Sequence, residues 1–234
     1  MSGTRLADAT SPEVDPGAAV DPTTLLVPLG ATEQHGPHLP LGTDATIAVA
    51  LADAAAARTP GVLVAPVLPY GSSGEHQDFP GTLSIGAEAT ELVLVELGRS
   101  ATETFDRVLF VNAHGGNATP LAAAVGRLRD EGRDVRAWSP RFGGDAHAGR
   151  TETSLILALD AAAAGERAEA GNTAPLGELI DELRARGVRA VSPNGVLGDP
   201  TGASAAEGRA LLAAAVEDLH TTIVAWPAAV GARA

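Results

Sequence analysis

Short strand-like runs alternate along this chain with longer segments of helical periodicity. The short runs lie at 25–30, 62–66, 107–111, 134–138 and 188–192. The longer segments, in which apolar residues recur at the spacing of a helix, lie at 43–58, 87–104, 119–131, 152–159, 176–186 and 205–225. The run at 62–66 is apolar on both faces, which is typical of a parallel strand covered by helices. The alternation predicts an α/β domain with a mostly parallel sheet.

A chain of 234 residues is long enough for one sizeable core, and we assign 22–234 to a single domain. Residues 1–21 are rich in Ala, Asp, Pro, Ser and Thr and lack the hydrophobic segment of a secretory signal. We expect them to form a poorly ordered tail. Because no apolar run reaches the roughly 18 residues of a membrane span, we expect a cytoplasmic protein without a membrane partner.

Charge and cysteine content exclude several kinds of function. The formal net charge is −13, which argues against nucleic acid as a partner, since a phosphate backbone requires a basic surface. The chain has no cysteine, so disulfide scaffolds, Fe–S clusters and cysteine nucleophiles are excluded. Hydrophobic residues make up 45% and charged residues 19%, as in an ordinary globular protein.

The loop after the first predicted strand carries the densest set of candidate ligands. Glu33, His35 and Asp44 offer oxygen and nitrogen atoms without sulfur, a set that suits zinc, iron or manganese. Prolines and glycines between them favour a rigid loop that aims side chains into a cleft. Asp44 has an alternative interpretation, because it stands where a residue could cap the following helix.

Two further loops after strands carry candidate functional residues. His114 follows the run at 107–111 and precedes two glycines, while His147 and Glu152 follow the run at 134–138. Taken singly, His114 could be structural, His147 could bond locally, and Glu152 could favour a helix dipole. The carboxyl ends of parallel strands meet at one edge of a sheet, so we expect these side chains to converge. The long polar loop 69–84 should form a wall of the same cleft.

These residues suffice for two metal ions if one carboxylate is shared. Asp44 is our choice for the bridge, because its short side chain leaves the start of a helix. Two ions roughly 3.5–4 Å apart can hold a hydroxide and polarise a carbonyl, as in amide hydrolysis. His147 is not needed as a ligand and could carry the proton to the leaving nitrogen.

Four segments resemble the creatininase (creatinine amidohydrolase) family: EQHGPHLP at 33–40, Thr43-Asp44, NAHGGN at 112–117 and HAGRTETS at 147–154. The resemblance implies a three-layer α/β/α domain, a dinuclear metal centre, amidohydrolase chemistry and a homo-oligomer, commonly a hexamer. It places metal ligands at Glu33, His35, Asp44, His114 and Glu152, and the catalytic histidine at His147. In creatininase itself a glutamate ligand stands where this chain has Gly116, which argues against creatinine as substrate. We expect Glu152 to take over that coordination.

Segments 71–76, 79–84 and 191–200 are similar to the mycofactocin-system branch of the family. That resemblance implies a peptidase that uses a metal-bound hydroxide to release the C-terminal Val-Tyr dipeptide from a modified precursor peptide. The alternatives are an amidohydrolase of small cyclic amides or formamides, and a non-catalytic protein that binds metal and peptide. We expect zinc and iron(II), with manganese also compatible. Candidate substrate-binding residues are Tyr70, His76, Arg141 and Arg150.

Overall fold

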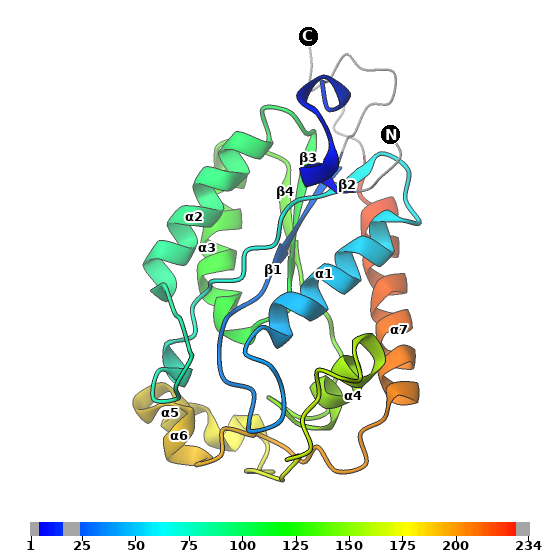
Figure 1. Ribbon diagram of the computed structural model, residues 1–234. Helices are drawn as coiled ribbons and strands as arrows, with labels where there is room; N and C mark the ends of the chain where they lie inside the picture. Colours follow the sequence, from blue (N-terminus) through cyan, green and yellow to red (C-terminus); the bar gives the residue numbers. More distant parts are fainter. Residues whose placement is uncertain (1–4, 16–23, 228–234) are drawn as a thin grey trace.

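Three layers, helix on sheet on helix, make up the part of the chain that the computed structural model describes, residues 5–15 and 24–227 (Figure 1). The sheet has four parallel strands in the order β2-β1-β3-β4, namely β1 (Thr24–Leu29), β2 (Val62–Val64), β3 (Arg107–Asn112) and β4 (Val135–Trp138). The helices are α1 (Thr43–Ala56), α2 (Gly86–Ala101), α3 (Ala118–Asp130), α4 (Arg150–Leu159), α5 (Leu176–Arg186), α6 (Val188–Val191) and α7 (Ala205–Val224). The predicted α/β/α architecture with a parallel sheet is confirmed.

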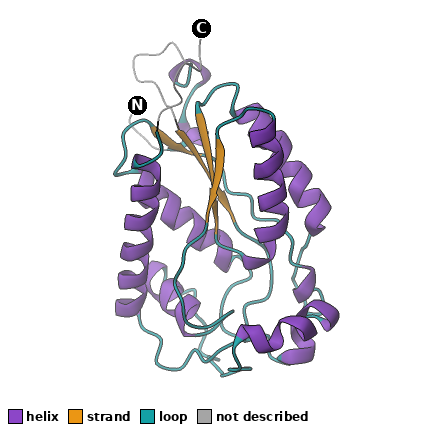
Figure 2. Cartoon of the chain, turned by 180° about the vertical axis from the view of Figure 1, so that it is seen from behind, coloured by secondary structure: helices purple, strands orange, loops and turns teal. Residues whose placement is uncertain are grey.

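The pleat of β1 explains the two helical layers. Leu25, Val27 and Leu29 pack into a cluster with residues of α2 and α3, whereas Leu26 joins the cluster formed with α1, α4 and α7. All six residues of β1 are buried, because helices cover both faces of the sheet (Figure 1, Figure 2). The strand is therefore a fixed support for the loop that follows it.

The carboxyl ends of the strands all lie at one end of the molecule, the lower end in Figure 1. The loops after β1, β2, β3 and β4 emerge there, and α5 and α6 lie beside them. The loop after β2 contains a 3-10 turn, η3 (Gly74–His76), and β3 leads into another, η4 (Gly115–Asn117). The fold thus collects all the loops that carry the candidate residues.

One predicted strand, 188–192, is wrong. This segment forms the short helix α6, which follows α5 after Gly187 with its positive φ of 76°. Val188 packs with Phe79, Leu183 and Leu197 in a small separate core. The segment has the composition of a strand, but it lies among loops and helices and belongs to no strand pair of the sheet.

Residues 5–15 of the expected N-terminal tail pack on the domain. They form two 3-10 turns, η1 (Leu6–Asp8) and η2 (Ser11–Glu13), and Leu6 and Val14 contact the core. The Arg5 guanidinium lies 2.5 Å from a carboxylate oxygen of Asp53. The rest of the predicted tail, 1–4 and 16–21, lies outside the described residues. None of the helices in the described ranges has the length and apolar content needed to cross a membrane.

Candidate metal centre

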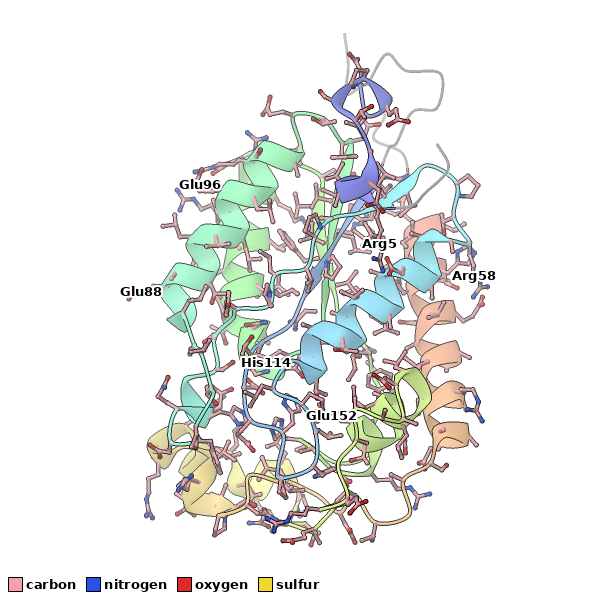
Figure 3. The ribbon with its side chains drawn as sticks, viewed as in Figure 1. Arg5, Arg58, Glu88, Glu96, His114 and Glu152 are labelled. Carbon is pink, nitrogen blue, oxygen red and sulfur yellow. The ribbon has the colours of Figure 1, made fainter. Side chains whose placement is uncertain are left out.

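Five side chains from the loops beyond β1, β3 and β4 come together. They form two groups whose possible ligand atoms lie within 4.8 Å of one another, Glu33–Asp44–His114 and His35–Asp44–Glu152. Figure 3 shows His114 beside the first turn of α1 and Glu152 on α4, across from it. The predicted convergence is thus present in the structure, and Asp44 belongs to both groups.

Asp44 lies between two imidazoles. Its Oδ1 is 3.1 Å from His35 Nε2, and its Oδ2 is 3.3 Å from His114 Nδ1. The side chain is buried in the first turn of α1, and the N-cap of that helix is Gly42. The carboxylate therefore faces the histidines rather than capping the helix, which is the position a bridging ligand needs.

Backbone carbonyl groups orient both histidines. The Nδ1–H of His35 donates to the carbonyl oxygen of Glu33 at 3.1 Å, which leaves Nε2 facing Asp44 and Glu152. The Nε2–H of His114 donates to the carbonyl oxygen of Ser72 at 2.9 Å, which leaves Nδ1 facing Asp44. These bonds select the tautomers that turn a lone pair inward, as at metal sites in general.

Buried carboxylate oxygens that accept no hydrogen bond make this cluster suited to cations. Both carboxylate oxygens of Glu33, together with Oδ2 of Asp44, are buried and accept no hydrogen bond from the described residues. Orphaned buried carboxylates are costly unless a cation neutralises them. The oxygen and nitrogen donors fit zinc, iron(II) or manganese. The side chains present therefore fit two divalent ions with Asp44 shared.

The pKa values of the histidines in the metal-free protein reflect the same negative charge. Burial alone lowers the pKa of His35, but Asp44 and the other carboxylates raise it to about 10. Burial likewise opposes ionisation of His114, yet Glu33 and Asp44 raise its pKa well above the usual value. Burial and Asp44 raise the pKa of Glu33, but His114 and His76 hold it at about 2. In the metal-free protein, His35 and His114 therefore carry protons at the positions where metal ions would bind.

His147 is held as a neutral imidazole beside this cluster. Its Nε2–H donates to the carbonyl oxygen of Gln34 at 2.8 Å, and its Nδ1 lies 3.8 Å from Glu33 Oε1. The ring lies between those of His35 and His76, with both centroid distances 4.4 Å. Burial and the nearby His35 lower its pKa. His147 also forms a third close group with Glu33 and His35, so its position suits both proton transfer and coordination.

The turn after His147 fixes Glu152. Ala148, with φ of 51°, is the one non-glycine residue of positive φ within the described ranges, and its N–H donates to Glu152 Oε2 at 2.6 Å. The backbone of His147 also pairs with that of Leu197. His147 and Glu152 are therefore held by one turn of the backbone.

Sequence reasoning missed two residues of the site. The Gln34 amide donates to His76 Nδ1 at 2.8 Å and to the Gly195 carbonyl at 3.1 Å, which directs His76 Nε2–H toward Glu33. Its position between Glu33 and His35 was the available signal.

The second missed residue is Glu75, whose carboxylate lies 3.8 Å from His114 Nε2. A Cβ at Gly116 would overlap this carboxylate, the Ser72 carbonyl and the His114 ring. Glu75 therefore fills the space beside Gly116, the position at which the resemblance to creatininase implies a glutamate. Burial raises the pKa of Glu75. The signal in the sequence was its place beside His76 in a long polar loop.

A cleft of about 730 Å³ opens from the cluster toward α5 and α6, with Glu33, His76, His114 and His147 in its wall. The His35–Asp44–Glu152 group does not line this cleft. Of the four candidate substrate-binding residues, only His76 lines it. Tyr70 and Arg141 are exposed elsewhere, and Arg150 binds Glu207 with Nε 2.8 Å from a carboxylate oxygen.

Comparison with known proteins agrees with this geometry. The family model described as "Creatininase: Creatinine amidohydrolase" matches residues 7–223. A relative from Mycobacterium ulcerans (strain Agy99), named "Mycofactocin precursor peptide peptidase", is 54% identical over 214 residues, 87% of this chain and 85% of its own.

Solved structures give the same fold. "Crystal structure of creatinine amidohydrolase (creatininase)" superposes with a TM-score of 0.81 at 25% identity, covering 95% of this chain and 97% of that one. "Creatininase Mn" gives 0.80 at 25% identity, covering 94% and 97%. The chain is therefore a hydrolase of carbon–nitrogen bonds that belongs to the creatininase family of metal-dependent amidohydrolases.

Proposed function

We propose that this protein is the metal-dependent peptidase that trims the modified mycofactocin precursor peptide and releases its C-terminal Val-Tyr dipeptide. The observation that carries the proposal is the relative of that name, 54% identical over most of both chains. The cleft of about 730 Å³ beside the cluster supports it, because it offers room for a peptide tail.

Each residue of the cluster takes a defined role in this proposal. Glu33, Asp44 and His114 would hold one divalent ion, and His35, Asp44 and Glu152 would hold the other. Such ions would lower the pKa of a water molecule and polarise the amide carbonyl. We propose zinc and iron(II); the same donor set also accepts manganese, the metal named for one creatininase structure.

His147 carries the proton in the proposed reaction. Its lowered pKa keeps the imidazole neutral near pH 7, and its bond to the Gln34 carbonyl leaves Nδ1 as the basic atom facing the cluster. It can therefore take a proton on the cluster side of the cleft and give it to the leaving amine. The His76 ring, which the Gln34 amide holds, packs against the His147 imidazole with a centroid distance of 4.4 Å.

The experiment is incubation of the metal-loaded protein with the modified precursor peptide, followed by mass spectrometry for free dipeptide. Release of the dipeptide, abolished by a chelator and restored by metal, is the expected result. Turnover of creatinine or another cyclic amide, with no dipeptide released, would favour a small-molecule amidohydrolase. The structural similarity to creatininase supports this alternative. Binding of metal and peptide without any product would favour the non-catalytic alternative. A homo-oligomer, which we also propose, is tested by light scattering.

A further inference from the structure

The carboxylate of Asp145 joins two segments of the chain close to His147. Its Oδ2 accepts a hydrogen bond from the N–H of Arg150, the first residue of α4, at 2.6 Å. The same oxygen accepts a hydrogen bond from the N–H of Asp199, in the loop between α6 and α7, at 3.3 Å. A single oxygen atom thus connects the start of α4 with a loop that is distant in sequence.

Along the chain, His147 lies between Asp145 and the start of α4, and its backbone pairs with the same distant loop. The N–H of His147 donates to the carbonyl oxygen of Leu197 at 3.2 Å, and the N–H of Leu197 donates to the His147 carbonyl oxygen at 2.9 Å. The N–H of Ala146 donates to the Leu197 carbonyl oxygen as well, at 3.0 Å. Asp145 therefore closes a turn that begins just before His147 and ends at α4.

Two glycines leave room for the Asp145 side chain in this turn. A Cβ at Gly149 would lie 2.1 Å from Asp145 Oδ2, and a Cβ at Gly198 would lie 2.4 Å from Asp145 Cβ. Gly198 also has a φ of 151°, which residues with a side chain rarely adopt. Any larger residue at either position would displace the carboxylate from its two donors.

We propose that Asp145 is a positioning residue for the metal centre, which sets the places of the His147 imidazole and of the Glu152 carboxylate together. Asp145 does not line the cleft and belongs to none of the three ligand groups, so it acts through these two residues. The inference rests on the roles proposed above for His147 and Glu152 and adds the residue that holds them.

The effect on Glu152 follows from its place in the first turn of α4. The N–H groups of a first turn have no partner within their helix, and Asp145 supplies one for Arg150. Glu152 stands two residues later and offers its carboxylate to the group that contains His35 and Asp44. When the bond to Asp145 is lost, the first turn can fray, and the ligand moves with it.

The effect on His147 follows from the distances that proton transfer requires. Its Nδ1 faces the cluster at 3.8 Å from Glu33 Oε1, and the ring is attached to the turn that Asp145 closes. A displacement of about 1 Å can cost an enzyme roughly 100-fold in rate. A small change in the turn should therefore lower kcat without preventing the substrate from binding.

The test compares Asp145→Ala, Asp145→Asn and Asp160→Ala with the wild type. Both hydrogen bonds of Asp145 end on one oxygen, so asparagine can accept them with its single carbonyl oxygen. Asp160 accepts a hydrogen bond from the N–H of Ala162 at 3.0 Å beyond the other end of α4, which makes Asp160→Ala the matched control. Metal content per chain is measured by elemental analysis, and kcat and KM are measured with the modified precursor peptide at saturating metal.

We expect Asp145→Ala to retain one ion per chain instead of two and to lose roughly 10–100-fold in kcat with KM nearly unchanged. Asp145→Asn and Asp160→Ala should keep both ions and the wild-type kcat. Circular dichroism verifies that each variant is folded.

Three results would overturn the inference and leave the peptidase function standing. These are an Asp145→Ala protein with two ions and the wild-type kcat, an Asp145→Asn protein that loses as much as Asp145→Ala, and an equal loss in Asp160→Ala. If the wild type releases no dipeptide, the proposed function is wrong. The metal contents of the variants still decide in that case whether Asp145 positions Glu152.

Discussion

Replacing Asp44 with asparagine tests the shared carboxylate most directly. Asp44 belongs to both ligand groups, and its two oxygens face His35 and His114 separately. The substitution keeps the size and one carbonyl oxygen but removes the charge. We therefore expect the variant to lose both ions together.

The size of the effect follows from electrostatics. With an effective dielectric constant of about 20, two unit charges 4 Å apart attract by roughly 4 kcal/mol, and a unit charge and a divalent ion by roughly twice that. The amide dipole of asparagine replaces part of this attraction. A loss of about half, ~4 kcal/mol per ion, corresponds to binding that is ~1000-fold weaker at each position.

Elemental analysis after gel filtration gives the metal content per chain. We expect two ions in the wild type, none in Asp44→Asn, and one in Glu152→Gln, which alters only one of the groups. An Asp44→Asn protein that retains one ion per chain would refute the shared ligand. Tryptophan fluorescence of the metal-free variant verifies its fold.

Four further predictions concern the same cluster. His147→Gln keeps a hydrogen-bond donor but no basic nitrogen, so turnover should fall about 10²–10⁴-fold with metal content unchanged; parallel loss of metal would make His147 a ligand. In the metal-free protein, the carboxylates raise the pKa of His35 from 6.5 to about 10 and that of His114 well above 6.5. Metal binding at pH 8 should therefore release about two protons and tighten as the pH rises, which calorimetry in buffers of different ionisation enthalpy measures; heats that do not depend on the buffer would contradict this. The stability that the protonated histidines give the metal-free fold should be full below pH 6.5 and should disappear as the pH rises through about 10. Gly116→Ala should lower the free energy of unfolding by about 1–3 kcal/mol and weaken metal binding, because its Cβ meets backbone and the His114 ring. Gly115→Ala, where a Cβ meets open space, is the control, and equal melting temperatures of the two variants would count against the argument.

Much of the fold was predictable because the sheet imposes its pattern on the sequence. A strand covered by helices on both faces must be apolar throughout, and β1 and β3 carry that signal clearly. The prediction of a strand at 188–192 was wrong because the segment has the composition of a strand but pairs with no strand of the sheet. The segment forms α6 because Gly187 adopts a positive φ and Val188 packs into a small core. That packing is a tertiary contact, which the local sequence does not reveal.

The site was predictable as far as it depends on strand ends. Loops that follow parallel strands share one edge, so the meeting of His114 with Asp44 and Glu152 could be anticipated. The sequence carried no comparable signal for the wall that α5 adds to the cleft, because that wall depends on how α5 lies against the loop of Glu75. Nothing in the local pattern encodes that contact between distant segments.

The two ligand groups differ in their access to solvent. Glu33 and His114 line the cleft, whereas His35, Asp44 and Glu152 do not, and His35 is fully buried. The Glu152 side chain keeps 20% of its surface exposed without lining this cleft, so an ion held by the second group would exchange with solvent by a separate route. A chelator should accordingly strip the protein in two phases, because it would reach the two positions by different routes.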